Sequence, residues 1–343
     1  MGRRSDPLEK AGEGTHMQKF IKPQRVWRWE IAIYLYLAGM GAGSYIIGTI
    51  VNWVASPTLP MTVLGFSLDL AKPALLWGPL FVAVGAPFLI IDLGIKRRFL
   101  YACLNPKTSW VARGFLILST FIVLGLIVLG VSLLYPQFSD HQPTLWLILE
   151  IVSLVFSFAT ALYTGVLLMS VRYVPIWNTP FLPILFLASA LSTGSMGVIL
   201  AMMGSGLLFP RAEALFLLGH NIVHYEKILI VIEGIILAFY LISRYRAKDQ
   251  GETSVRLLLS GRLRLLFWGG IVLTGFVFPI TLEYIYSCWP DYPILLYTTG
   301  AFLLCGGFFL RLGVLASGVK EQLPMPKLVE IKASLRSFKE NRS

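Results

Sequence analysis

The sequence predicts an all-α integral membrane protein with eight transmembrane helices in two four-helix bundles. Apolar residues make up 56% of the 343 residues and charged residues only 14%. The mean hydropathy of +0.72 is higher than a soluble domain needs to fill its core. Eight apolar segments recur along the chain, each near or above the roughly 20 residues that cross the hydrocarbon core of a bilayer. We expect these spans at about 29–53, 74–95, 110–135, 145–171, 181–203, 222–243, 263–287 and 292–317.

The positive charges between the spans predict the orientation of the chain. Of the 29 Lys and Arg residues, 25 fall on the side that holds both termini, and only Lys72 and Arg211 fall on the other side. By the positive-inside rule, both termini are predicted to be cytoplasmic in the inner (cytoplasmic) membrane. The net charge of +11 is therefore a topology signal, and no nucleic-acid partner is expected.

Polar and basic tails flank the spans. Residues 1–28 lack the apolar core of a cleavable signal peptide, so we expect the first span to be permanent. The basic C-terminal tail at 318–343 suits a membrane lipid surface or a partner protein.

The cysteines and histidines do not form a ligand set for a redox metal. Cys103, Cys288 and Cys305 lie far apart with no C-x-x-C pair, and no histidine lies deep in a predicted span. We therefore expect no haem, iron–sulfur cluster or other metal in this chain. Metal chemistry would belong to a partner.

The first span begins with polar groups and continues into small residues. Glu30 and Tyr34 are four residues apart and share one helix face just inside the cytoplasmic boundary. Gly39 and Gly43 follow, with a spacing that lets a neighbouring helix approach closely. We expect the glycines to serve helix packing.

Asp92 ends the second span, directly before a cluster of basic residues. An acid in an apolar run costs about 2.5–3.5 kcal/mol on insertion scales, so its presence needs a reason. One interpretation is a structural clamp to Arg97 or Arg113, and the other is a proton acceptor at the edge of a buried pocket. Both remain open at this stage.

The fourth span and the connector after it complete the first half of the chain. Tyr163 lies toward the inner third of its span, at the membrane level of Glu30 and Tyr34. In the connector 172–180, Pro175 and Pro180 prevent a continuous helix. We expect a rigid crossover between a first four-helix bundle at 29–171 and a second at 181–317.

Buried acids are the main feature of the second half. Glu226 and Glu233 are seven residues apart and lie on one face of the sixth span, with Glu233 near mid-bilayer. They could form a proton relay with Asp92 at the inner end, or Glu233 could be a protonated acid in a packing seam. Glu283 and Arg311 are further buried charges that we expect to be structural pairs.

Taken together, these residues resemble the NrfD/PsrC family, the membrane subunits of quinone-linked molybdenum and iron–sulfur oxidoreductases. The resemblance covers nearly all the spans, and the order and spacing of its motifs are more specific than any one of them. The motifs are Trp27–Gly39, Asp92–Gly94, Asn105–Gly114, Tyr163–Leu168, Val174–Asn178 and Gly306–Arg311.

The resemblance implies two four-helix bundles, no bound redox cofactor and a quinone site. Glu30, Tyr34 and Tyr163 match the family's quinone pocket, and their shared depth with Asp92 and Arg113 extends the candidate site. The implied substrate is menaquinone or ubiquinone, and the implied partners are a ferredoxin-like iron–sulfur subunit and a molybdopterin or other catalytic subunit. Many relatives dock the iron–sulfur partner on the outer face, whereas the charges place this pocket on the cytoplasmic side.

The expected function is that of a quinone-reactive membrane subunit of a respiratory oxidoreductase, with proton translocation as a further expectation. Two alternatives remain open from the sequence. A secondary transporter would also carry buried carboxylates, although it would typically show inverted repeats with broken spans. A purely structural membrane anchor would need neither the acids nor the pocket tyrosines.

Overall fold

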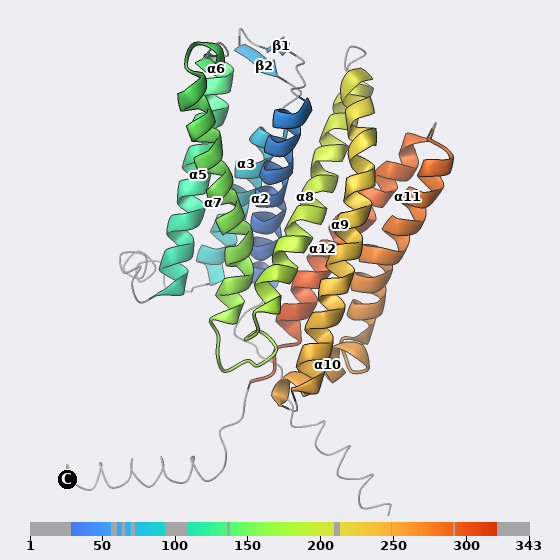
Figure 1. Ribbon diagram of the computed structural model, residues 1–343. Helices are drawn as coiled ribbons and strands as arrows, with labels where there is room; N and C mark the ends of the chain where they lie inside the picture. Colours follow the sequence, from blue (N-terminus) through green and yellow to red (C-terminus); the bar gives the residue numbers. More distant parts are fainter. Residues whose placement is uncertain are drawn as a thin grey trace, which may run out of the picture.

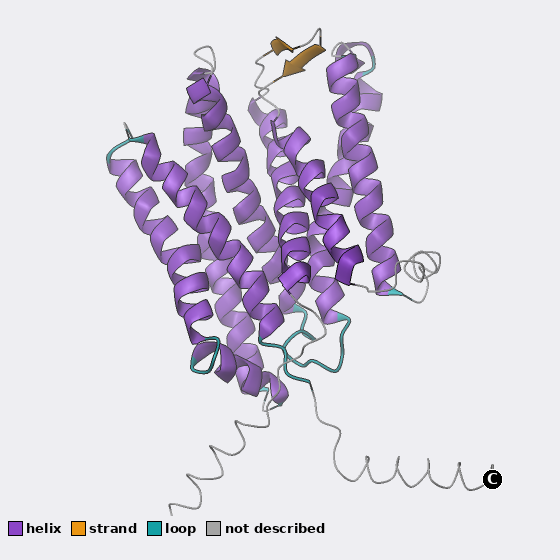
Figure 2. Ribbon diagram, turned by 180° about the vertical axis from the view of Figure 1, so that it is seen from behind, coloured by secondary structure: helices purple, strands orange, loops and turns teal. Residues whose placement is uncertain are grey.

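The computed structural model describes nine stretches of the chain: residues 29–55, 60–63, 66–69, 73–92, 109–135, 138–208, 213–247, 249–290 and 292–320. Long helices run side by side along one common direction, with a small hairpin at one end (Figures 1 and 2). The helices are α2 (Trp29–Ala55), α3 (Pro73–Asp92), α5 (Trp110–Leu134), α6 (Phe138–His141), α7 (Pro143–Met169), α8 (Phe181–Leu208), α9 (Glu213–Arg246), α10 (Gln250–Leu259), the π-helix η2 (Leu266–Val277), α11 (Phe278–Cys288) and α12 (Pro293–Ala316).

Seven helical segments of the described chain are long and apolar enough to cross a membrane. They coincide with seven of the predicted spans, and η2 and α11 together form one of them. The remaining predicted span, 74–95, falls on α3, in which Trp77–Leu89 is a shorter apolar helix. The chain is thus a multi-pass integral membrane protein, while the count of eight spans remains a prediction.

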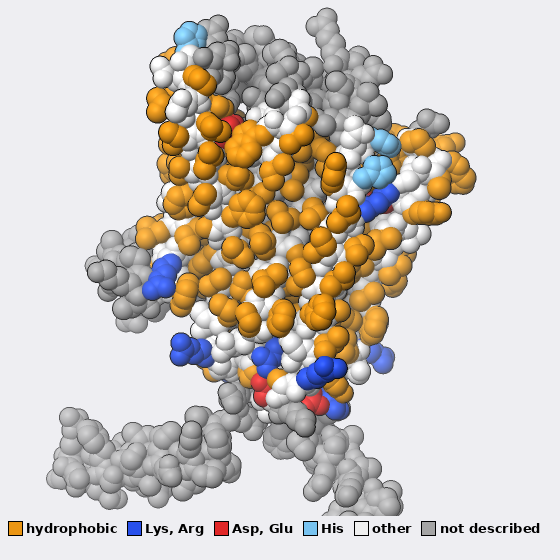
Figure 3. Space-filling model, in the orientation of Figure 1, with side chains coloured by type: hydrophobic (Ala, Val, Ile, Leu, Met, Phe, Trp, Pro, Cys, Tyr) orange, Lys and Arg blue, Asp and Glu red, His pale blue; other side chains and the backbone are white. Residues whose placement is uncertain are grey.

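On the face seen in Figure 3, hydrophobic side chains cover the middle of the molecule, and most of the visible Lys and Arg side chains of the described residues lie at the end where α10 lies. The apolar belt is what a lipid-facing surface requires. The clustering agrees with the charge count of the sequence, and the cytoplasmic orientation of this end remains a prediction.

Helix α2 lies at the centre of the bundle. It packs against α3 and α7 from the first half of the chain and against α8 and α12 from the second half. Around it, α5 contacts α3 and α7, whereas α12 contacts α8, η2 and α11. The first and second halves therefore share a common interface, and their division into two four-helix bundles remains a prediction.

Small residues let α2 approach its neighbours closely, as the sequence predicted. A Cβ atom added to Gly43 would lie 1.8 Å from the carbonyl oxygen of Ala190 on α8. One added to Gly41 would lie 2.5 Å from the carbonyl oxygen of Gly78 on α3. Because lipid tails are as apolar as the side chains, such close van der Waals packing is a main source of helix association in a membrane.

Two short elements were not expected from the sequence. The strands β1 (Pro60–Val63) and β2 (Phe66–Asp69) form an antiparallel hairpin in which Val63 pairs with Phe66. Apart from this short hairpin the described elements are helical, in agreement with the predicted all-helical membrane fold. Helix α10 lies in the basic segment between the sixth and seventh predicted spans and begins where the side chain of Asp249 accepts a hydrogen bond from Gly251 N at 2.7 Å.

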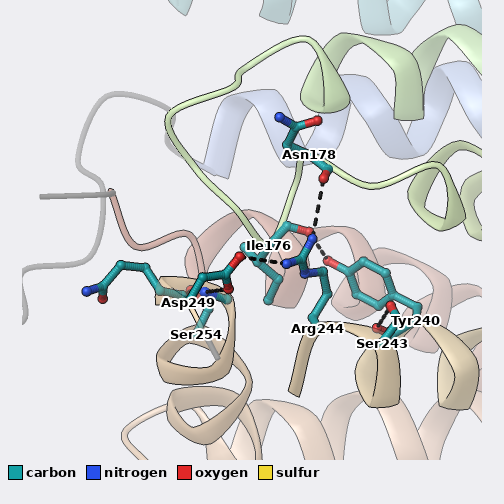
Figure 4. Close-up of polar contacts among 9 residues, drawn as sticks. Ile176, Asn178, Tyr240, Ser243, Arg244, Asp249 and Ser254 are labelled. Atoms are coloured by element: carbon teal, nitrogen blue, oxygen red, sulfur yellow. Dashed lines mark hydrogen bonds and ion pairs between the residues drawn. The ribbon is translucent and has the colours of Figure 1, made fainter. Parts of the chain in front are cut away.

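The connector between the halves is fixed to the second half by hydrogen bonds. The hydroxyl of Tyr240 on α9 donates to the carbonyl oxygen of Ile176 at 2.9 Å, and Arg244 joins the carbonyl oxygen of Asn178 to the carboxylate of Asp249 (Figure 4). The indole N–H of Trp177 donates to the carbonyl oxygen of Val314 on α12 at 2.8 Å. These bonds tie the connector to α9 and α12, and the crossover between two separate bundles remains a prediction.

Candidate functional site

Tyr163 on α7 is held at the start of α5. Its side chain is buried, and its hydroxyl donates to the carbonyl oxygen of Trp110 at 3.1 Å. The ring lies directly over Gly114, where an added Cβ would sit 1.7 Å from the ring carbon Cζ. Helix α5 starts here because the hydroxyl of Ser109 caps it by accepting from Ala112 N. Gly114 is thus required for the position of Tyr163.

Tyr34 and Glu30 bring unpartnered polar groups to the same region from α2. Tyr34 is fully buried, and its hydroxyl has no hydrogen-bond partner in the described structure. Tyr34 and Tyr163 lie close enough to interact electrostatically. Glu30, one helical turn away on the same face, buries a carboxylate oxygen that likewise has no partner there. Unpaired buried groups of this kind are costly, and a ligand would remove that cost.

Arg113 and Asp92, the other two residues of the predicted quinone site, are placed differently from the two tyrosines. Arg113 is exposed, and its guanidinium stacks on the ring of Trp110 at 4.6 Å from the centroid. Because Trp110 also supplies the carbonyl that Tyr163 binds, Arg113 lies at the edge of the tyrosine site. Asp92 is the last residue of α3, and its side chain lies outside the described part of the structure.

Glu233 of the predicted proton path is buried among groups of the second half and the interface. Its carboxylate lies near Ser189 on α8 and in the electrostatic field of Arg311 on α12. Ser189 in turn accepts a hydrogen bond from Arg311 at 2.9 Å. Glu233 also lines a narrow recess, together with Thr193 of α8, Phe276 of η2 and other residues of η2 and α12. This recess is too narrow to hold a water molecule.

Arg311 connects Glu233 to the central helix α2. The guanidinium is fully buried and donates to the carbonyl oxygens of Leu35 at 3.2 Å and Gly307 at 2.9 Å. Gly39 provides the room, because a Cβ at that position would lie 2.6 Å from the guanidinium. The sequence predicted that Gly39 would admit a helix, whereas the structure shows that it admits a side chain. Leu35 directly follows Tyr34, so Arg311 reaches the main chain beside the tyrosine site.

Glu226, the other acid of the predicted path, faces Glu283 on α11. Both side chains are fully buried, and the two carboxyl groups lie close enough to interact with each other. Within the described structure, none of their four oxygens receives a hydrogen bond from another donor. Glu283 is therefore paired with another acid, not with a cation.

Sequence reasoning found the tyrosines and acids but not the groups that position them. The contacts of Gly114 with Tyr163, of Ser189 with Arg311 and of Glu226 with Glu283 each link positions far apart in the chain. No local sequence pattern reveals such contacts. An available signal was the second acid, Glu283, in an apolar run. Among the described residues, no group of three or more His, Cys, Asp or Glu side chains is arranged to hold a metal ion.

Comparison with known proteins places this arrangement in a family. The chain is 30% identical to the C chain of polysulfide reductase from Wolinella succinogenes over 277 residues, which cover 75% of this chain and 83% of the relative. It is 27% identical to protein NrfD of Escherichia coli over 326 residues, which cover 89% of this chain and 98% of that protein. A family model described as polysulphide reductase, NrfD, matches residues 17–321. The chain therefore belongs to the NrfD family of polysulphide reductase proteins.

Proposed function

We propose that this chain is the membrane subunit of a respiratory oxidoreductase complex and exchanges electrons and protons with the membrane quinone pool. Family membership over residues 17–321 supports the role of a complex subunit. The relative from Wolinella succinogenes is by name one chain of polysulfide reductase, so that enzyme has other chains. The partners we propose here are a ferredoxin-like iron–sulfur subunit and a molybdopterin or other catalytic subunit.

The observation that carries the quinone site is the pairing of Tyr34 and Tyr163 beside an unpartnered Glu30 oxygen. A quinone presents carbonyl oxygens that accept hydrogen bonds and take up protons as they are reduced. A phenol hydroxyl can donate to such an oxygen, and a carboxyl group can give or accept the proton. Tyr34 would orient the head group, Tyr163 would complete the contact, and Glu30 would exchange the proton.

Arg113 and Asp92 belong to the rim of the proposed site. Arg113 is exposed at the edge of the tyrosine site, where its charge suits the approach of an acidic partner. Asp92 would carry protons between the site and the cytoplasmic boundary, and Glu226 and Glu233 would extend the path through the second half. The substrate class is menaquinone or ubiquinone.

Purification of the tagged full-length chain from native membranes tests this proposal. We expect an iron–sulfur protein to copurify, and the complex to oxidise or reduce a soluble quinone analogue with an artificial redox partner. A chain that purifies alone and accumulates a solute in proteoliposomes would instead be a secondary transporter. A complex whose quinone turnover is unchanged when Tyr34, Tyr163 and Glu30 are all replaced would make this chain a structural anchor.

A further inference from the structure

The strongest unexplained feature of the second half is the contact between Glu226 on α9 and Glu283 on α11. Other buried acids have a donor or a cation nearby: the carboxylate of Glu150 accepts from the indole N–H of Trp53 at 2.8 Å, and that of Glu233 lies near Ser189 and Arg311. In contrast, the two carboxyl groups of Glu226 and Glu283 have only each other within the described structure. Both side chains are fully buried.

Two ionised carboxylates cannot form a hydrogen bond, because neither has a proton to donate. Close together in a low-dielectric interior, both their mutual repulsion and their desolvation are strongly unfavourable. A single proton removes both problems, since it turns one acid into a donor and leaves the other as its acceptor. Paired carboxyl groups that share one site behave in this way.

The surroundings set the charge of the pair. Lys227 is the nearby cation, but its ammonium donates to the hydroxyl of Ser287 at 2.5 Å and forms no ion pair with either acid in the described structure. The other titratable group that interacts with Glu226 is Glu233 on the same helix. Nearer the end of α9, a ring nitrogen of His220 lies 3.0 Å from the hydroxyl of Tyr286 on α11. One proton on the pair leaves a single negative charge, which Lys227 balances.

We propose that Glu226 and Glu283 form a proton-binding site that holds one proton between two buried carboxyl groups. The proposal rests on the proposed function only in that Glu226 belongs to the proton path, and it adds Glu283 as the partner that makes Glu226 able to hold a proton. The half-buried His220 and the Tyr286 hydroxyl lie toward the end of α9 that the sequence places at the outer boundary. The site is therefore well placed to exchange protons with that side.

Glu226 is seven residues from Glu233, which corresponds to about 10 Å along the helix. This separation is too long for direct proton transfer, so the two acids are separate stations. Their separation also distinguishes the proposed site from Glu233, which already has Ser189 and Arg311 as partners.

Infrared spectroscopy of the full-length chain in lipid nanodiscs tests the site without quinone or partner proteins. A protonated carboxyl group has a carbonyl-stretch band that ionised carboxylates lack, and the band shifts in heavy water. Between the wild type and the double variant Glu226→Gln/Glu283→Gln, we expect a loss equal to the intensity of one carboxylic acid. Each single variant should retain at most that one band.

The control is Glu252→Gln, because Glu252 lies near the surface in an ion pair with Arg256 at 2.8 Å. It should leave the band unchanged. Loss of the intensity of two acids in the double variant would mean two independent neutral acids and would overturn the proposal. No loss would mean that both acids are ionised, which would overturn it as well.

The wild type alone provides a second readout if a variant fails to fold. Its carboxylic-acid band should be present at neutral pH and should be the same in sodium and in choline buffers. A band that disappears on addition of sodium ions would identify a metal-cation site in place of a proton site. The infrared assay contains no quinone, so a result that overturns the proton site would not affect the proposed quinone function. Conversely, absence of quinone turnover would not affect the proposed proton site.

Discussion

Tyr163 in the first half and Tyr240 in the second make the same type of bond in different surroundings. Each is a buried tyrosine whose hydroxyl donates to a main-chain carbonyl oxygen, at 3.1 Å for Tyr163 and 2.9 Å for Tyr240. Tyr240 thereby fixes the connector to α9, near Ser243 and Arg244 of the same helix (Figure 4). Tyr163 lies next to Tyr34, whose own hydroxyl has no partner in the described structure. The hydrogen bond alone therefore does not separate the tyrosine of the proposed quinone site from the one in the connector; their neighbours differ.

The largest effect that would test this contrast comes from Gly114. In the variant Gly114→Ala the new Cβ would lie 1.7 Å from the ring of Tyr163, so the ring must move. A displacement of about 1 Å in a reacting group can reduce the rate about a hundredfold, and we expect a loss of quinone turnover of that order. The measurement is steady-state turnover of the purified complex.

Gly130→Ala on the same helix is the matched control, because a Cβ there meets nothing within 4 Å. It should leave turnover unchanged. Equal losses in the two variants would mean that α5 tolerates no added methyl group, and the special position of Tyr163 would lose its support.

A smaller effect is expected from removing the tyrosine hydroxyl alone. Tyr163→Phe keeps the ring and removes one hydrogen-bonding group, a change of about 1 kcal/mol or roughly five- to tenfold in turnover. Tyr240→Phe removes a comparable bond in the second half, so its cost in thermal stability should be similar while turnover is retained. Glu30→Gln should behave like Tyr163→Phe. Unchanged turnover in both Tyr163→Phe and Glu30→Gln would place the quinone site elsewhere.

How far the sequence predicts this molecule depends on the range of the interactions involved. The spans follow from the length of apolar runs, so the third predicted span, 110–135, agrees with α5 (Trp110–Leu134). The hairpin and α10 were missed because short elements outside the bilayer have weak patterns. Gly43 was correctly assigned to close packing, since small residues at helical spacing have few other uses in a membrane.

The site is less predictable than the spans for a related reason. Membrane depth could predict Tyr34, Tyr163 and Glu233 as candidate residues, because depth follows from position along a span. Depth does not say which side chains meet laterally. The pairing of Glu226 with Glu283 and the reach of Arg311 to α2 depend on helix packing, which only the structure supplies.

Replacing Glu233 in the second half should affect proton translocation but not electron transfer. Glu233→Gln keeps the shape and can still bind Ser189, but it cannot ionise. In proteoliposomes we expect nearly intact electron transfer under uncoupled conditions and a lower proton gradient. Glu150→Gln is the control in the first half, since Glu150 is also buried and hydrogen-bonded, to Trp53. An undiminished gradient in Glu233→Gln would make this acid a structural group.

The smallest effect concerns the connector and should appear in stability alone. Trp177 and Trp268 both donate an indole N–H to a main-chain carbonyl oxygen, at 2.8 Å to Val314 and 3.1 Å to Leu259. Trp177 is buried, whereas Trp268 is about half exposed near the loop that joins α10 to η2. Trp177→Phe should therefore lower the free energy of unfolding by about 1 kcal/mol, and Trp268→Phe by less. The loss stays moderate because the Val314 carbonyl still accepts from the hydroxyl of Ser317 at 3.0 Å. Thermal unfolding of both variants in detergent, with quinone turnover measured in parallel, would check this order. If Trp177→Phe lost turnover without losing stability, the connector would take part in the reaction and would not only hold the two halves together.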